Sequence, residues 1–181
     1  TIFMSRSNDL PATEPPLTGE QCREMGRLCL AHNLRRATRV ISAHYDHAFK
    51  AAGLKSTQVS VLATIRGMTG EGQVCRMGSL AKVMRMEVST LTRNLAVLER
   101  DGLIVIDEGD DRRVRHVSLT QEGEAKLAQI YPVWCALQQT MTDYLEPETQ
   151  ELLLTLLAHL RRFDDQPPES QKACVHPVIT K

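Results

Sequence analysis

The most regular pattern of apolar and polar positions lies between residues 79 and 120. Four apolar residues recur there at steps of three, four and three, which is the spacing of one helical face: Val88, Leu91, Leu95 and Leu98. The other positions in the first half of this helix carry hydrogen-bonding side chains: Ser89, Thr90, Thr92, Arg93 and Asn94. Arg and Asn can pair bidentately with base edges, and Ser and Thr reach bases or phosphates. A solvated surface helix would show the same pattern.

The segments on either side of this helix favour a DNA-reading helix over a solvated surface helix. Leu80, Ala81 and Met84 predict a short supporting helix, with Ser79 as its N-cap. A β-prone run at 103–106 and the alternating Val117 and Leu119 predict two strands. The segment 107–114 between them is too charged to pack and predicts a hairpin. Three arginines project from this hairpin and suit contact with a DNA backbone or minor groove: Arg112, Arg113 and Arg115. A surface hairpin with internal ion pairs is the alternative.

Long helical patterns flank this region on both sides. Thr18 to Gln21 fits a capping box, and the apolar positions that follow predict about thirty residues of helix that end at Gly53. Such length suggests that a second subunit covers part of the helix, although an internal kink would also explain it. A helix at 56–65 and a loop containing Gly70 and Gly72 lead to the supporting helix.

After Thr120, a second long pattern predicts a helix that Pro132 should bend. Pro147 is expected to begin a last, leucine-rich helix, which needs a partner surface. We expect that partner to be the N-terminal helix of a second copy. The two recognition helices of such a dimer must lie roughly 34 Å apart to read two half-sites.

Taken together, these motifs resemble the MarR family of bacterial transcription regulators. The resemblance rests on Val-Ser-x-Leu-Thr-Arg-Asn-Leu followed by Gly-Leu-Ile, on Asp-x-Arg at 111–113 and on Ser-Leu-Thr-x-x-Gly at 118–123. It covers about residues 20 to 163. It implies an obligate dimer that binds pseudo-palindromic operators, usually represses, and responds to a small molecule or an oxidant. It also implies that Arg113 enters the minor groove and that Asp111 orients this arginine. Many members carry Arg where this chain has Asp110, so wing affinity is expected to be reduced.

The expected fold is mostly α with a small β-wing: a winged helix-turn-helix with long N- and C-terminal dimerisation helices. Five regions are expected along the chain. They are a flexible arm at 1–17, an N-terminal dimerisation helix at 18–52, a DNA-binding lobe at 53–120, C-terminal dimerisation helices at 121–165 and a disordered tail at 166–181. The partners expected from this organisation are double-stranded DNA, a second copy of the chain and a small-molecule effector, with no membrane.

Composition constrains this interpretation. The net charge is zero and the pI is near 7.0, so any binding to DNA must depend on local clusters of basic residues. Binding to DNA without sequence preference is expected to be weak. No apolar stretch approaches a membrane span, and no signal-peptide pattern opens the sequence. Five cysteines without a paired framework favour a reducing cytoplasm. No phosphate-binding glycine motif, nucleophile elbow or HExxH is present, so we do not expect an enzyme or a cofactor.

The signal to which the regulator responds is the least determined part of the prediction. Polar and aromatic candidates for binding an aromatic carboxylate are His32, Arg36, Arg39, His44, Tyr45 and Trp134. These arginines could equally be solvated or bridge two lobes. Cys22 and Cys29 share a helical face and are candidates for oxidant sensing, although buried apolar cysteine is commoner. The Cys29–His32 and His44–His47 pairs lack further ligands, so no metal site is predicted. A winged-helix module that binds protein instead of DNA remains the competing function.

Overall fold

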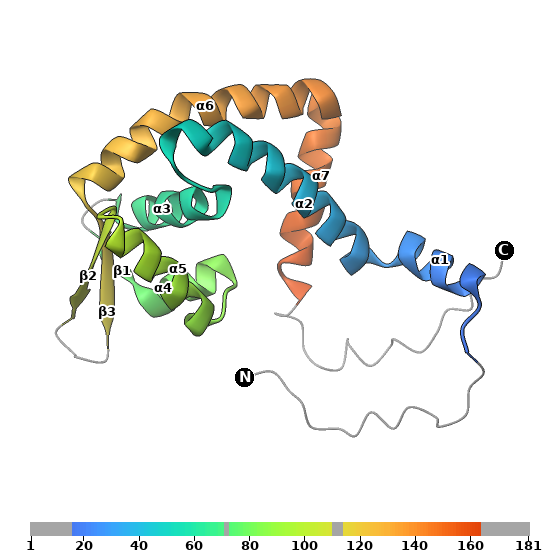
Figure 1. Ribbon diagram of the computed structural model, residues 1–181, viewed down its shortest axis with the longest axis horizontal. Helices are drawn as coiled ribbons and strands as arrows, with labels where there is room; N and C mark the ends of the chain where they lie inside the picture. Colours follow the sequence, from blue (N-terminus) through green and yellow to red (C-terminus); the bar gives the residue numbers. More distant parts are fainter. Residues whose placement is uncertain (1–15, 71–72, 110–113, 164–181) are drawn as a thin grey trace. The chain divides into compact units, whose positions relative to one another are not determined.

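The computed structural model describes residues 16–70, 73–109 and 114–163 (Figure 1). Helices dominate the described residues, and a three-stranded antiparallel sheet accompanies them. This arrangement confirms the predicted mostly α fold with a small β-wing. The chain divides into two structural units between Tyr45 and Asp46.

The N-terminal unit contains two helices where the sequence predicted one. α1 (Gly19–Leu28) begins at the predicted capping box: Gln21 N–H donates to Thr18 Oγ1 at 3.2 Å, and Thr18 N–H donates to Gln21 Oε1 at 2.8 Å. The helix then ends at Cys29, whose backbone is extended, and α2 (Leu30–Phe49) follows. The Asn33 amide donates to the carbonyls of Arg27 and Cys29, both at 3.0 Å. The bond to Arg27 supplies a partner for a carbonyl near the end of α1, where helices leave carbonyls without intrahelical bonds.

The C-terminal unit begins with the end of α2 and holds the helix-turn-helix. A short 3₁₀ helix, η1 (Lys50–Ala52), ends at Gly53, which adopts a φ of 74° as the predicted helix stop requires. α3 (Ser56–Met68), α4 (Met77–Met84) and α5 (Val88–Arg100) then follow. The N-cap of α4 is Arg76, so the predicted N-cap Ser79 is wrong: this residue lies inside the first turn of the helix.

The sheet contains one strand more than the sequence predicted. β2 (Ile104–Glu108) and β3 (Arg115–Leu119) form the predicted hairpin, with Ile104 opposite Leu119 and Glu108 opposite Arg115. β1 (Cys75–Arg76) pairs with the other edge of β3, so the strand order is β1-β3-β2. Cys75 is therefore a buried strand residue opposite Val117.

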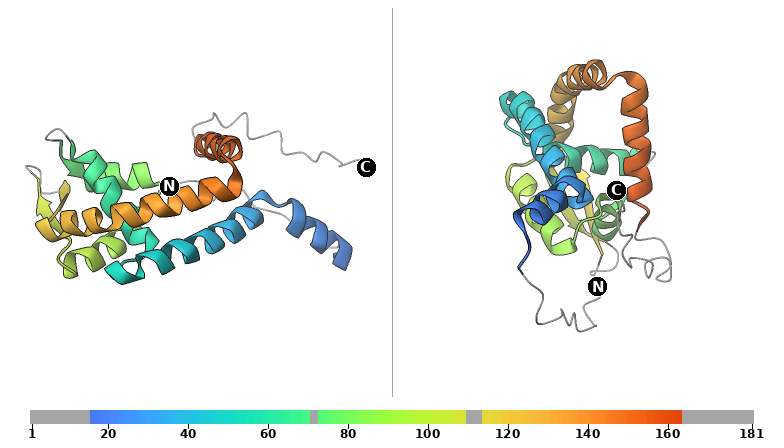
Figure 2. Two further views of the ribbon diagram at one scale, coloured as in Figure 1. Left: turned by 90° about the horizontal axis from the view of Figure 1, so that it is seen from above. Right: turned by 90° about the vertical axis from the view of Figure 1, so that its right-hand side faces the viewer.

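The core of this unit lies between the three helices and the sheet, which are grouped together in both figures (Figures 1 and 2). Its members are almost fully shielded from solvent and come from α3, α4, α5 and two strands: Leu62, Ile65, Leu80, Leu91, Leu95, Leu98, Ile104 and Val117. Burial of a side chain of this size contributes about 2 kcal/mol. The core thus fixes α5 against the sheet and determines which of its faces remains exposed.

Two further helices complete the C-terminal unit. α6 (Gln121–Leu145) starts at Thr120, which caps it, and passes through Pro132 without ending. α7 (Pro147–Leu160) begins with Pro147 at its first position, as predicted. Glu146 between them has a φ of 63°, and α7 leaves the end of α6 at a sharp turn (Figure 2). None of the residues of α7 is buried within the single chain.

Candidate nucleic-acid interface

Helix α5 has two chemically different faces. Leu91, Leu95 and Leu98 are fully buried and face the core. Because successive residues turn by about 100° in an α-helix, Ser89 and Arg93 lie on the opposite side. Both are exposed, and exposed Thr90 and Thr92 lie on the flanks between the two faces. The sequence-predicted polar residues are thus presented together on the outside of the unit.

Asn94 differs from the other predicted reading residues. It is half-buried, and its position on the helix places it beside the leucine face. Its amide is therefore less accessible than the groups of Ser89 and Arg93. Ala96, which was not among the predicted reading residues, lies on the outward face near Arg93.

Val88 is the one member of the predicted apolar face that is not in the core. It is the first residue of α5 and is 53% exposed, whereas the three leucines are inaccessible to solvent. The residues from Glu87 to Thr90 are all exposed, so the core ends at Leu91 and does not reach the first turn of the helix. The sequence placed Val88 on the same helical face as the leucines, and the structure adds that this end of the face is exposed.

Local hydrogen bonds orient two of the outward side chains. Thr92 Oγ1 donates to the Val88 carbonyl at 2.8 Å. Arg93 Nε donates to the Ser89 carbonyl at 3.3 Å. A guanidinium carries five N–H donors, and this bond uses one of them. The planar end of Arg93 is thus held along the helix surface, next to Ser89.

The turn between α4 and α5 depends on an arginine in a left-handed conformation. Arg85 has a φ of 51°, which is uncommon for a residue with a side chain. Its N–H donates to the Lys82 carbonyl at 3.1 Å, and Met86 N–H donates to the Ala81 carbonyl at 3.0 Å. These two bonds form the Schellman arrangement that ends a helix and reverses the chain. The turn brings the start of α5 alongside α4.

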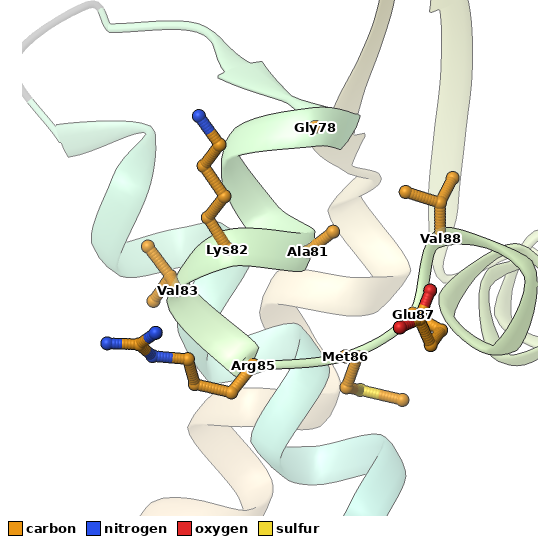
Figure 3. A pocket seen from close by; sticks show the side chains of 8 residues that line it. All are labelled: Gly78, Ala81, Lys82, Val83, Arg85, Met86, Glu87 and Val88. Atoms are coloured by element: carbon orange, nitrogen blue, oxygen red, sulfur yellow. The ribbon is translucent and has the colours of Figure 1, made fainter. Parts of the chain in front are cut away.

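Two neighbouring grooves share Gly78, Lys82 and Val88 in their lining. The first has a volume of about 890 Å³ and is lined by residues of α4 and of the turn, together with Val88 (Figure 3). In Figure 3 the side chains of Lys82 and Arg85 extend from the α4 side, and Val88 stands on the α5 side. The second groove, of about 500 Å³, runs between α4 and β3. Its lining includes three cations from three elements: Arg76, Lys82 and Arg115.

The described part of the hairpin runs to Gly109 on one side and resumes at Val114 on the other. Strand pairing continues to Glu108 and Arg115, and Gly109 N–H donates to the Val114 carbonyl at 2.8 Å. Arg115 is exposed on β3. The predicted wing residues Asp111, Arg112 and Arg113 lie outside the described residues, so their roles remain predictions.

The α2 residues that are candidates for binding the effector lie on different sides of that helix. His32, Arg36 and Arg39 recur at steps of four and three and share one face, on which all three are exposed. Tyr45 lies near the opposite side, and His44 lies between the two. Trp134 is on α6, is 40% exposed and stacks on Tyr131, with ring centroids 5.9 Å apart.

The cysteines differ in their access to solvent. Cys22 and Cys29 are exposed in the single chain, as is Cys135. Burial raises the pKa of the Cys75 thiol, which makes this residue a poor nucleophile. Within the described ranges, no cluster of three or more His, Cys, Asp or Glu residues could hold a metal ion. Among the same residues, every helix is too short or too polar to cross a bilayer.

Comparison with known proteins places this geometry among transcription regulators. A sequence model of the MarR family matches residues 52–113. The HTH-type transcriptional regulator YwoH of Bacillus subtilis is 30% identical over 101 residues, which are 56% of this chain and 71% of YwoH.

Solved structures give the same result. The M. tuberculosis transcriptional regulator MosR, in complex with DNA, is 34% identical with a TM-score of 0.63; the match covers 75% of this chain and 99% of MosR. The transcriptional repressor CouR, bound to a 23-mer DNA duplex, is 25% identical with a TM-score of 0.67, over 76% of this chain and 97% of CouR.

Proposed function

The chain belongs to the MarR family of transcription regulators, and from this premise we propose that it binds operator DNA as a homodimer. Each subunit inserts the first half of α5 into a major groove and places its hairpin on the flanking backbone. The operator is pseudo-palindromic because the two subunits are related by a two-fold axis. The protein acts as a repressor, as its similarity to the transcriptional repressor CouR suggests.

The observation that carries this proposal is the division of α5 into two faces. Three leucines hold the helix on the core, while Ser89 and Arg93 stand on the opposite side with nothing from the described C-terminal unit covering them. A guanidinium and a hydroxyl at adjacent helical positions match the hydrogen-bonding groups of base edges and phosphates. Phosphate-binding cations surround the same helix end, at Arg76, Lys82 and Arg115.

The homodimer is supported by apolar side chains that each unit leaves exposed. In the N-terminal unit these are Met25, Leu28, Leu30, Val40 and Ile41. In α7 they are Leu152, Leu153, Leu154 and Leu156. Exposed apolar surface of this extent marks an interaction site in a soluble protein. A second copy of the chain supplies the matching surface, and its symmetry supplies the second recognition helix.

Binding to a duplex is tested by measuring affinity at several salt concentrations. The probe is a sequence selected by the protein from a random library of duplexes, and light scattering reports the mass of the complex. For a dimer that contacts phosphates, the logarithm of the binding constant falls linearly with the logarithm of the salt concentration, with a slope of about −0.9 per phosphate contact. A protein that selects no sequence, or that binds a duplex as a monomer, would contradict the proposal.

A small organic anion is the proposed effector. Exposed Arg36 and Arg39 share a face of α2 with His32, which offers cations to a carboxylate. We expect an aromatic carboxylate to raise the melting temperature of the wild type and to lower its affinity for DNA. Arg36→Ala should remove both effects, and Arg27→Ala on α1 serves as the control. A melting temperature that responds to peroxide and not to carboxylates would favour Cys22 and Cys29 as the sensor instead.

A further inference from the structure

Val88 occupies an unusual place for an exposed valine. It is the first residue of α5, and its side chain lines both grooves beside the turn. An exposed β-branched side chain at this point contributes nothing to the core of the single chain. Its surroundings instead suggest a partner outside the protein.

The charges around Val88 identify the chemistry of that partner. Arg76, Lys82 and Arg115 line the second groove together with Val88, and its described lining includes no carboxylate. The first groove adds Arg85, with Glu87 as its one acidic lining residue. Cations from β1, α4 and β3 therefore converge on one end of the recognition helix. A string of phosphates complements this arrangement, because each phosphate meets a cation from a different element.

A duplex held by these cations presents base edges to the start of α5. Val88 cannot donate or accept a hydrogen bond, so it distinguishes bases only through apolar contact. In the major groove the C5-methyl of thymine is the apolar group on a base edge, and small apolar side chains contact it. We propose that Arg76, Lys82 and Arg115 hold the phosphate backbone and that Val88 thereby contacts a thymine methyl in each half-site. This inference rests on the proposed binding of operator DNA.

The test removes one methyl group from the DNA at a time. Each thymine of a selected operator is replaced by deoxyuridine, which keeps every hydrogen-bonding group. For the wild type we expect one position in each half-site at which the substitution weakens binding about fourfold, the effect of one buried methyl group. Val88→Ala should bind the thymine operator more weakly and lose its sensitivity at that position, because the two changes remove one contact.

Val133→Ala is the matched control. Val133 is 38% exposed on α6 and lines neither of the two grooves. This variant should keep the wild-type response to deoxyuridine. Both valines are exposed, so both variants should retain the wild-type melting temperature. Lys82→Gln should lower affinity equally for thymine and deoxyuridine operators and reduce the salt slope by about one phosphate contact.

The results separate this inference from the proposed function. If the wild type binds its operator but no deoxyuridine substitution weakens binding, the contact with thymine is wrong and DNA binding stands. If deoxyuridine weakens binding equally for the wild type and Val88→Ala at every position, the proposed contact with thymine is also wrong. Failure to select any duplex overturns both proposals together.

Discussion

Gly123 lies directly against the backbone carbonyl of Leu103. A β-carbon at position 123 would be 2.1 Å from the Leu103 oxygen, which is far inside van der Waals contact. Gly123 is buried in the first turn of α6, and Leu103 immediately precedes β2. This contact joins the long C-terminal helix to the winged lobe. It also gives a physical reason for the glycine in the Ser-Leu-Thr-x-x-Gly motif.

Gly123→Ala should therefore destabilise the protein severely. The methyl group meets backbone and cannot be relieved by a rotamer change, so we expect a loss of about 3 kcal/mol in the free energy of unfolding. Denaturant unfolding measures this loss. Gly67→Ala in α3 is the control, because a β-carbon there meets no atom within 4 Å. That substitution should leave stability unchanged or increase it by about 0.5 kcal/mol. Similar losses in the two variants would refute the close approach.

Thr120 supports the same junction through its hydroxyl group. Its Oγ1 accepts a hydrogen bond from Gly123 N–H at 3.1 Å and donates one to the Gly102 carbonyl at 2.6 Å. Thr120→Val keeps the shape and removes both bonds, so it should cost about 1.5 kcal/mol of unfolding free energy. Thr120→Ser retains the hydroxyl and should stay closer to the wild type. If the two variants unfold at the same denaturant concentration, the hydroxyl does not have this role.

Asp46 makes part of the free energy of unfolding of the protein dependent on pH. Its Oδ1 accepts a hydrogen bond from Ser56 N–H at 2.6 Å, at the start of α3. Hydrogen bonds with the side chain and the backbone of Ser56 lower the pKa of Asp46, and Lys55 lowers it further. A carboxylate with a lowered pKa stabilises the folded state above its ordinary pKa of about 3.9. This stabilisation is lost as the pH falls through the lower value of the folded state.

The measurement compares wild type and Asp46→Asn between pH 2 and pH 7. The wild type should be the more stable of the two at neutral pH, and the difference should shrink below about pH 4. Glu24→Gln on α1, for which no such hydrogen bond is described, controls for the loss of a charge. A difference that stays constant down to the lowest pH would show that the carboxylate is not linked to folding.

Helices and strands could be predicted from the sequence wherever the spacing of apolar residues matches the residues that are buried. The three leucines of α5 determine both its span and its core-facing side, because a helix with this spacing has one way to bury them. Spacing alone could not show that the core ends at Leu91, so the exposure of Val88 was not predicted. The residue on which the proposed contact with thymine depends was therefore not singled out from the sequence.

Elements fixed by backbone contacts between distant segments were not predictable. β1 has two residues, and its strand character comes from pairing with β3 rather than from any local pattern. The break at Cys29 is not marked by a proline or glycine at that position; the Asn33 side chain, four residues later, donates to the Arg27 carbonyl near the end of α1. Among the site residues, Arg76 and Lys82 belong to elements far from the wing in sequence. Only the fold brings them beside Arg115.

Arg93 provides the sharpest test of the reading surface. It lies opposite the buried leucines near the N-terminal end of α5, where a guanidinium can pair with guanine. Arg93→Ala should relax the base preference at one position of each half-site, by about 1 to 3 kcal/mol between the preferred and the other bases. The preference is measured by competition among operators that differ at single positions.

Arg100 is the matched control for Arg93 on the same helix. It lies on the same outward face but at the C-terminal end, where its guanidinium pairs with Asp101 at 2.9 Å. Arg100→Ala removes an equal charge and should keep the base preference of the wild type. If both variants lose affinity equally for every operator, α5 contributes charge rather than base contacts. Another element would then have to recognise the DNA sequence, and the proposed orientation of α5 in the major groove would be wrong.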